Sequence, residues 1–216
     1  MTLGPQKKAV ISLLQKFLIK VRYGMVLQVI KNRITKIGIE FTPFYWFREG
    51  INGTTMPDVK GNISDYSVEF LGPGDMKLIE TITSVYPEEK LLAFLKAGQK
   101  CLGIKYKNEI AAYMWINLNK LEYKSILIHF ESNEAYLWNM FTMESYRGKN
   151  LAPYLRYKSY EMLHEMGRDK LYSISEYFNS PAIKFKQKLN AKILKLMLHI
   201  RLFKKFQWNF TLKTYS

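Results

Sequence analysis

The chain has 216 residues, of which 48% are hydrophobic and 15% aromatic, and this composition predicts a folded protein with a sizeable core rather than a disordered chain. A single cysteine, Cys101, excludes an internal disulfide, so the chain lacks the disulfide framework of small secreted proteins. The three histidines are scattered and share no ligand spacing with Cys101, so the sequence predicts no metal site.

The net charge of +15 is concentrated at the two ends of the chain. Residues 1–40 carry eight Lys or Arg and one acid, and residues 183–216 carry nine basic residues and no acid. Such flanks favour an anionic partner, which the charge alone leaves open between cofactor phosphates, an anionic membrane surface and nucleic acid. Nucleic acid is disfavoured because the chain contains no recognised nucleic-acid-binding motif.

The first predicted element is an amphipathic helix over residues 7–34, where apolar residues recur every three to five positions between lysines and arginines. Its apolar stripe has three alternative partners: the rest of the chain, an anionic membrane surface, or another protein. Charged residues interrupt the most apolar stretch, 9–30, too often for a membrane-spanning helix, and no signal-peptide pattern follows it. We therefore expect a cytoplasmic protein, either soluble or peripheral to a membrane.

The next segment, residues 37–64, differs in amino-acid composition from its neighbours. It starts with the aromatic run EFTPFYWFREG, which we expect to be extended in part, and continues with closely spaced Gly, Asn-Gly and Pro-Asp turn signals. This change predicts a boundary near residue 62. The predicted organisation is an N-terminal appendage, residues 1–62, followed by a main domain, residues 63–216.

The main domain is predicted to alternate strands and helices. A strand at 66–71 is followed by helices at 75–85 and 87–97 and by strands at 100–106 and 109–118. After the strand-like segments 124–130 and 134–143 we expect a helix at 151–166, a strand at 170–175, a helix at 179–189, and final strands at 191–199 and 205–214. This order predicts an α/β or α+β fold, in which helices pack against the faces of one sheet. The chain has no G-x-G-x-x-G or Walker sequence.

The most informative feature is a strand that runs into the basic turn Arg147-Gly148-Lys149 and then directly into a helix. Free backbone N–H groups converge at the positive end of a helix, which makes such a turn suitable for a pyrophosphate. Taken alone, the same pattern also fits a solvated helix cap, for which Asn150 is a suitable N-cap residue.

The stretch Arg147-Gly148-Lys149-Asn150-Leu151-Ala152 resembles the acyl-CoA signature (Arg/Gln)-x-x-Gly-x-(Gly/Ala) of the GNAT acetyltransferase superfamily. Asn150 replaces the central glycine. A second family signature is matched further on by Asn179, Ala182-Ile183 and Phe185-Lys186. The resemblance covers residues 66–214. It implies a mixed, mostly antiparallel sheet flanked by helices and the transfer of an acetyl or similar acyl group from acyl-CoA to an amine, without a metal.

The resemblance also implies which residues hold acetyl-CoA. The turn would bind the pyrophosphate, the end of the preceding strand would pair with pantetheine through main-chain groups, and the amide of Asn179 would reach the pantetheine end. These cofactor-binding residues are Phe141, Met143, Arg147, Gly148, Lys149, Asn150, Leu151, Ala152 and Asn179.

The proton-transfer groups are less clear. Many family members place a tyrosine acid where this chain has Lys186, which is open to three roles: an acid, a surface charge, or a contact to a CoA phosphate. Glu134 and Glu176 are the further catalytic candidates, each at a predicted strand end, with Glu131, Glu144, His129, Tyr172 and Ser175 placed similarly. The acceptor amine (sugar, small metabolite or peptide), the acyl chain length and the oligomeric state stay open, and the alternative function is a degenerate module that binds acyl-CoA or a partner without turnover.

Overall fold

A computed structural model describes residues 38–215 of the chain. These residues divide into two compact units. The larger unit comprises Phe47–Ile174 and Phe185–Lys192, and the smaller unit comprises residues 38–46 together with Ser175–Lys184 and residues 193–215. The predicted helix at 7–34 lies outside the described residues, and the predicted boundary near residue 62 stays a prediction.

The larger unit is built on a mostly antiparallel sheet, as expected. Its strand order is β8-β7-β4-β3-β2, in which β7 and β8 are parallel and the other neighbours antiparallel. The end of β1 (Ile39–Glu49) lies beside β8 in this unit. The other strands are β2 (Tyr66–Leu71), β3 (Lys100–Tyr106), β4 (Glu109–Asn117), β7 (Glu134–Thr142) and β8 (Lys170–Glu176), close to the predicted strands.

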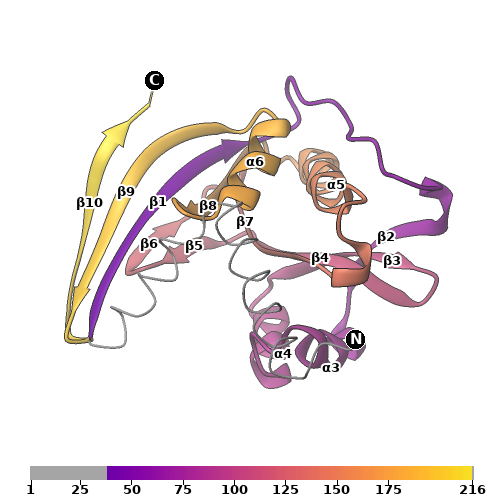
Figure 1. Ribbon diagram of the computed structural model, residues 1–216, viewed down its shortest axis with the longest axis horizontal. Helices are drawn as coiled ribbons and strands as arrows, with labels where there is room; N and C mark the ends of the chain where they lie inside the picture. The colour runs from indigo at the N-terminus through magenta and orange to yellow at the C-terminus, as the bar shows by residue number, and fades with distance from the viewer. Residues whose placement is uncertain (1–37, 216) are drawn as a thin grey trace, which may run out of the picture. The chain divides into compact units, whose positions relative to one another are not determined.

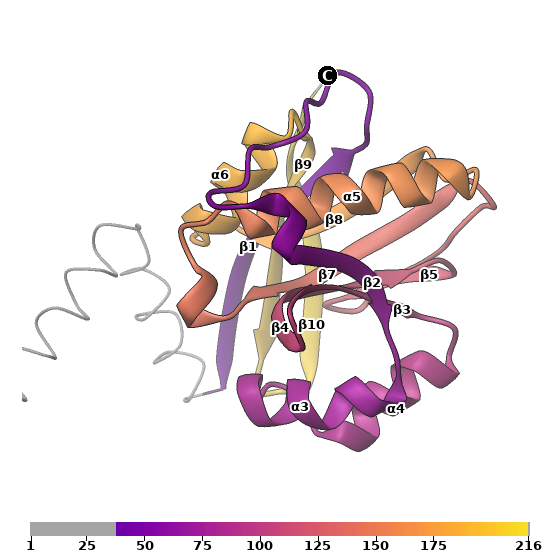
Figure 2. The ribbon, with the colours of Figure 1, turned by 90° about the vertical axis from the view of Figure 1, so that its right-hand side faces the viewer.

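Helices cover both faces of this sheet (Figures 1 and 2). Helices α3 (Pro73–Thr83) and α4 (Glu88–Lys96) lie on one face, and α5 (Leu151–Glu165) lies on the other. The Asp75 carboxylate accepts a hydrogen bond from the Gly72 N–H at 2.8 Å and so caps the start of α3. After α5 the chain leaves the helix at Gly167 with a φ of 74°, which confirms the predicted glycine stop.

Residues 119–130 differ from the single strand expected at 124–130. They form a two-stranded hairpin of β5 (Lys120–Tyr123) and β6 (Ile126–His129). Its turn residues, Lys124 and Ser125, both have positive φ. Because such turns usually carry Asn-Gly, the Lys-Ser sequence gave no turn signal and the hairpin was missed. Two short 3₁₀ helices, η1 (Ile63–Asp65) and η2 (Glu144–Tyr146), complete the larger unit.

The smaller unit is a three-stranded sheet of order β10-β9-β1, in which β9 (Lys192–Leu202) and β10 (Phe206–Thr214) pair antiparallel. The aromatic run expected to be partly extended is strand β1. Helix α6 (Ser180–Lys188) spans the two units in sequence, since its residues up to Lys184 belong to the smaller unit. Among residues 38–215, no helix is both long and apolar enough to cross a membrane.

Candidate active site

The parallel strands β7 and β8 pair only at their beginnings. Three residue pairs join them, from Glu134 opposite Lys170 to Tyr136 opposite Tyr172. Strand β7 nevertheless stays paired with β4 as far as Thr142. The second half of β7 therefore presents an open backbone edge on the side where β8 has diverged.

A β-bulge lies in the same half of β7. Between the pairs Tyr113–Phe141 and Trp115–Trp138, β7 has two intervening residues where β4 has one. One of the two is Asn139, whose φ is 47°. A bulge bends its strand and increases the local twist, so it accounts for the divergence of β7 from β8.

The hydrogen bonds of β7 show which of its residues point their main chain at the open edge. The Met143 N–H donates to the Ala111 carbonyl at 2.9 Å, and the Met143 carbonyl accepts from the Tyr146 N–H at 3.0 Å. Because antiparallel pairs alternate, Phe141 also directs its main chain toward β4, whereas Thr142 directs its N–H and carbonyl away from β4. Along the open edge, the main-chain groups of Thr142 are therefore the ones that face away from β4, and the pairing of pantetheine with this strand stays a prediction.

The turn after η2 has the backbone of an anion-binding turn. Gly148 has a φ of 79°, and no heavy atom would lie within 4 Å of a Cβ added there. Asn150, the N-cap of α5, has a φ of 64°, which asparagine adopts more readily than other residues that carry a side chain. Its side-chain amide donates to the Asp58 carbonyl at 3.0 Å. Asparagine can therefore occupy the position of the family's glycine without a change of backbone conformation.

Two cations flank this turn. The Arg147 Nε donates to the Thr142 carbonyl at 3.3 Å, and its Nη1 lies 3.6 Å from the Glu144 carboxylate. The Lys149 Nζ lies 5.0 Å from the centre of the Tyr146 ring. The Arg147 side chain is exposed and Lys149 is partly exposed, so each can reach an anion bound at the start of α5. Leu151 and Ala152 form the first turn of α5, whose leading N–H groups have no partner within the helix.

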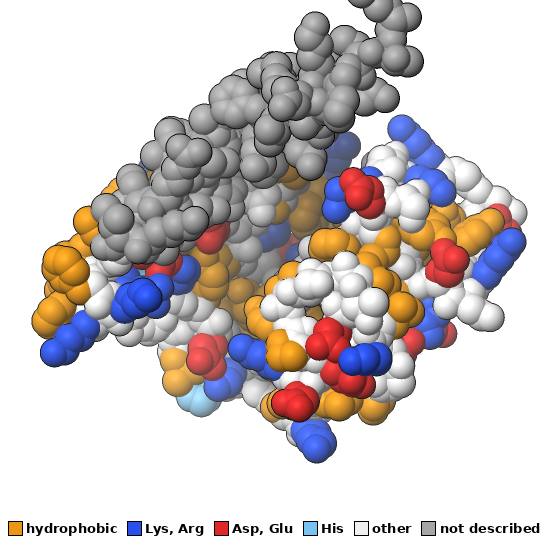
Figure 3. Space-filling view, turned by 60° about the horizontal axis from the view of Figure 1, so that its bottom comes forward, with side chains coloured by type: hydrophobic (Ala, Val, Ile, Leu, Met, Phe, Trp, Pro, Cys, Tyr) orange, Lys and Arg blue, Asp and Glu red, His pale blue; other side chains and the backbone are white. Residues whose placement is uncertain are grey.

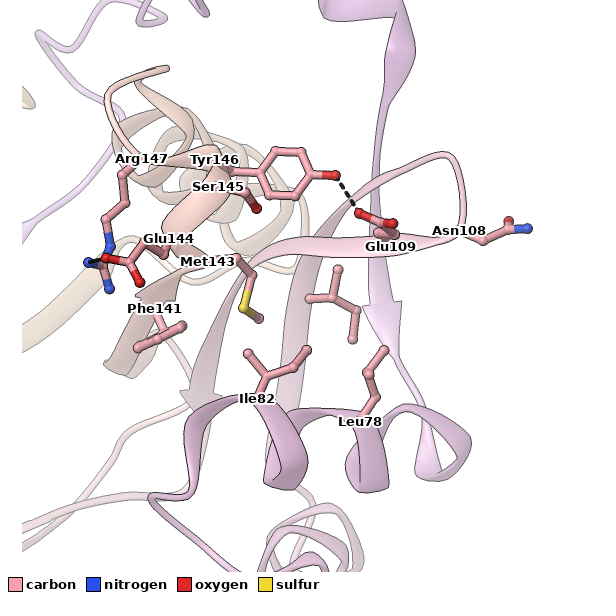
Figure 4. A pocket seen from close by; sticks show the side chains of 11 residues that line it. Leu78, Ile82, Asn108, Glu109, Phe141, Met143, Glu144, Ser145, Tyr146 and Arg147 are labelled. Carbon is pink, nitrogen blue, oxygen red and sulfur yellow. Dashed lines mark hydrogen bonds and ion pairs between the residues drawn. The ribbon is translucent and has the colours of Figure 1, made fainter.

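A pocket of about 630 Å³ adjoins the turn (Figure 4). Its apolar wall includes Phe141 of β7 and the following Met143, together with side chains of α3. Its polar rim contains the hydrogen bond from the Tyr146 hydroxyl to Glu109, at 2.8 Å, and the Arg147–Glu144 pair. The full lining is Leu78, Ile82, Asn108, Glu109, Ile110, Phe141, Met143, Glu144, Ser145, Tyr146 and Arg147.

Glu134 lies at the opposite end of β7 from this pocket. Its carboxylate accepts hydrogen bonds from the Tyr172 hydroxyl, at 3.0 Å, and from the Glu131 N–H, at 3.1 Å. Burial and the neighbouring Glu134 raise the pKa of Tyr172. Glu176 and Asn179 belong to the smaller unit, so their roles stay predictions.

Lys186 is not a surface charge, contrary to one of its expected roles. Its side chain is 3% exposed, and its Nζ donates to the Ile174 carbonyl at 3.1 Å and lies 3.9 Å from the Glu49 carboxylate. This carbonyl belongs to β8 beyond the last residue paired with β7. Lys186 therefore holds the diverging half of β8 from within the core.

Glu49 is the centre of a buried polar cluster that the sequence did not reveal. Its carboxylate accepts hydrogen bonds from the hydroxyls of Tyr160 and Ser173, and it lies 3.5 Å from the Arg156 Nε. The cluster is completed by Lys186, so it joins β1, α5, β8 and α6 within the larger unit. The one available signal was Glu49 itself, a carboxylate at the end of a strand that is rich in aromatic residues.

The cluster shifts the ionisation of its members. Burial lowers the pKa of Lys186 to about 7, although the nearby Glu49 opposes this shift. Burial alone would raise the pKa of Glu49, but Arg156, Lys186 and the two hydroxyl donors together lower it. Burial and the charge of Glu49 raise the pKa of Tyr160 well above its usual value. Glu49 is therefore the anion of the cluster, and Lys186 changes charge near neutral pH.

Comparisons with known proteins support the resemblance. The model of the acetyltransferase (GNAT) family matches residues 70–191, more than half of the chain. No curated protein matches the chain.

Solved structures share the fold at low sequence identity. A GNAT-family acetyltransferase from Colwellia psychrerythraea has a TM-score of 0.56 at 13% identity. The match covers 78% of this chain and 59% of the Colwellia protein. A putative GNAT acetyltransferase from Novosphingobium aromaticivorans has a TM-score of 0.54 at 17% identity, and the match covers 76% of this chain and 66% of that protein. A tandem GNAT protein from the clavulanic acid biosynthesis pathway has a TM-score of 0.52 at 11% identity, and the match covers 82% of this chain and 55% of that protein. This chain thus spans less than two thirds of the length of each of these structures. The match to the family model covers the diverging strands β7 and β8 and the turn at the start of α5. The chain therefore belongs to the acetyltransferase (GNAT) family.

Proposed function

We propose that this chain transfers an acetyl or similar acyl group from acyl-CoA to the amine of an acceptor. The observation that carries the proposal is the continuity of two features: the open edge of β7 leads directly into the turn at the start of α5. A pantetheine arm and a pyrophosphate need these two features in this order. Acyl-CoA would supply the acyl group as an activated thioester.

The turn would hold the pyrophosphate. The N–H groups of Gly148, Leu151 and Ala152 supply donors at the positive end of α5, and Lys149 and Arg147 add charge. The left-handed backbone of Asn150 supports the same conformation that a glycine would adopt there.

The strand edge would position the reacting thioester. Thr142 directs its main-chain N–H to the open side of β7, where its carbonyl already accepts from Arg147, and Phe141 and Met143 contribute apolar side chains to the adjoining pocket. Holding two reactants at attack distance removes much of the entropic barrier of a bimolecular reaction. We assign positioning as the main catalytic contribution of this site.

The proton must leave the attacking amine and a proton must reach the departing sulfur. Lys186 stays a candidate acid, because its pKa of about 7 lets it hold or release a proton at neutral pH. The structure favours a positioning role for it, since its Nζ is bonded to the Ile174 carbonyl and lies next to Glu49. Glu134 is disfavoured as the base because Tyr172 and Glu131 already bond its carboxylate.

Two measurements test the proposal. Acetyl-CoA should raise the melting temperature of the full chain, because a ligand that binds only the native state stabilises it by mass action. Free thiol should then appear when a panel of sugar, small-metabolite and peptide amines is supplied, faster as rising pH deprotonates the amine. The absence of any shift with acetyl-CoA, longer acyl-CoAs and CoA would refute cofactor binding. A clear shift without thiol release across the panel would indicate a binding module and refute the transfer reaction.

A further inference from the structure

The hairpin of β9 and β10 exposes an aromatic residue at its tip. Phe203 is 73% exposed, the largest value among the bulky hydrophobic side chains of residues 38–215. Phe203 and Lys204 have φ values of 51° and 57°, and the Lys205 N–H closes the turn on the Leu202 carbonyl at 3.1 Å. Asn-Gly is the usual sequence for a turn with two positive φ angles, because other residues adopt this conformation at a cost. The tip therefore keeps an exposed phenylalanine where local turn chemistry disfavours it.

The exposed apolar surface continues along β10. Phe206, Trp208 and Phe210 alternate along the strand and so share one face, and each is about half exposed. The rings of Phe206 and Trp208 are stacked, with centroids 6.3 Å apart. Leu212 follows at the bulge near the end of β10 and is 55% exposed. A contiguous row of this kind marks an interaction surface.

The hairpin that carries this surface is rich in positive charge. Residues 193–216 contain five Lys or Arg and no Asp or Glu. The buried Glu40 of β1 pairs with Arg201 at 2.6 Å, which leaves Lys204 and Lys205 at the tip unneutralised by that acid. Figure 3 shows hydrophobic side chains beside Lys or Arg at its left-hand edge, where the hairpin turn lies in Figure 1.

We propose that the tip and exposed face of the β9–β10 hairpin form a docking surface for an anionic membrane. Phenylalanine and tryptophan enter the interfacial region of a bilayer, and lysines beside them bind its acidic headgroups. The hairpin reaches the same end of the smaller unit as the start of β1, since the Phe203 N–H donates to the Gly38 carbonyl at 2.7 Å. Residues 1–37, which precede Gly38 in the sequence, contain eight Lys or Arg and no Asp or Glu.

A second copy of the chain is a poorer occupant of this surface. Strand β10 is the edge of the sheet, but it carries Lys213 and a bulge between Thr211 and Lys213, features that oppose the pairing of edge strands. Two copies would also bring like charges together. An anionic bilayer neutralises the lysines and buries the aromatic side chains at once.

Co-sedimentation of the full chain with vesicles tests the surface. We expect binding to phosphatidylcholine–phosphatidylglycerol vesicles, weakened by salt, and little binding to pure phosphatidylcholine. Phe203→Ser should weaken partitioning by about tenfold or more. Lys204→Glu should weaken it by at least about fivefold, the loss expected for one lysine near such a surface. Leu127→Ser and Lys96→Glu are the matched controls, because both side chains are exposed and both lie in the larger unit.

Three results would overturn the proposal. The first is the absence of binding to the charged vesicles. The second is vesicle binding that the hairpin substitutions leave unchanged, since that result would assign the membrane contact to residues 1–37. The third is self-association without lipid that Trp208→Ser abolishes, with no vesicle binding, which would assign the surface to a second copy. Melting temperatures of all variants, measured alongside, ensure that a loss of binding reflects the surface rather than unfolding. The outcome does not depend on whether the chain transfers an acyl group.

Discussion

The side-chain nitrogen of Lys186 lies 3.9 Å from Oε1 of Glu49, and both side chains are buried. Arg156 approaches the second oxygen of the same carboxylate. One anion thus stands between two cations in the core of the larger unit, beside the half of β8 that diverges from β7. The candidate site therefore depends on a buried charge cluster for the position of one of its strands.

Glu49→Gln should destabilise the protein strongly. The substitution leaves Arg156 and Lys186 buried without their anion, and breaking a buried pair in this way costs about 3–5 kcal/mol. Denaturant unfolding should show this loss at neutral pH. Glu161→Gln is the matched control: it breaks the partly exposed pair with Lys158, at 2.6 Å, and should cost about 1 kcal/mol or less. Equal losses in the two variants would contradict a structural role for the cluster.

Lys186→Met should flatten the pH dependence of stability in the alkaline range. The pKa of Lys186 is about 7 in the folded protein and near its usual 10.5 in the unfolded chain. Between these values the unfolded state binds more protons, so this residue makes the wild-type protein more stable as pH rises from about 7 to about 10.5. The free energy of unfolding of both proteins, measured across this range, gives the difference in slope. Parallel curves would show that Lys186 keeps an ordinary pKa.

Two substitutions in the turn should differ in their effect on CoA binding, because only one of them strains the backbone. Gly148→Ala meets no steric clash, but it places a Cβ on a residue with a φ of 79°. The turn then stays in place at a cost of about 1 kcal/mol or relaxes, and either response weakens binding. Asn150→Gly keeps the left-handed backbone and loses only the bond to Asp58, so CoA affinity should stay within about threefold of wild type. Isothermal titration calorimetry with CoA measures the affinity of each variant. Similar losses of affinity in both variants would argue against the turn as the phosphate site.

Lys149→Ala should weaken the binding of acetyl-CoA but not that of acetylpantetheine, which lacks the phosphates. A charge-assisted bond to an anion contributes about 1.5–3 kcal/mol, which corresponds to a loss of at least about tenfold. Lys96→Ala, in the exposed last turn of α4, controls for the change in net charge. An equal loss with both ligands would place Lys149 near the pantetheine instead.

Much of the larger unit could be predicted because its signals are local. Strand periodicity, the cap at Gly72 and Asp75 and the glycine stop at Gly167 all act within a few residues. The turn from Arg147 to Ala152 was found for the same reason. Asn150 replaces the family's central glycine in this turn, and its φ of 64° shows that the backbone accommodates it.

The tertiary structure alone decided which way the site residues face. Whether Phe141 or Thr142 directs its main chain to the open edge depends on the register between β7 and β4, and a shift of one residue reverses the answer. A surface charge was one of three roles that the sequence left open for Lys186, yet its side chain is buried in the core beside Glu49 of β1, far away in sequence. The amino-acid sequence by itself determined the order of the elements and the chemistry of the turn, since these follow from neighbouring residues. Long-range packing decided the strand register and the burial of charge, because both depend on partners that meet only in the folded chain.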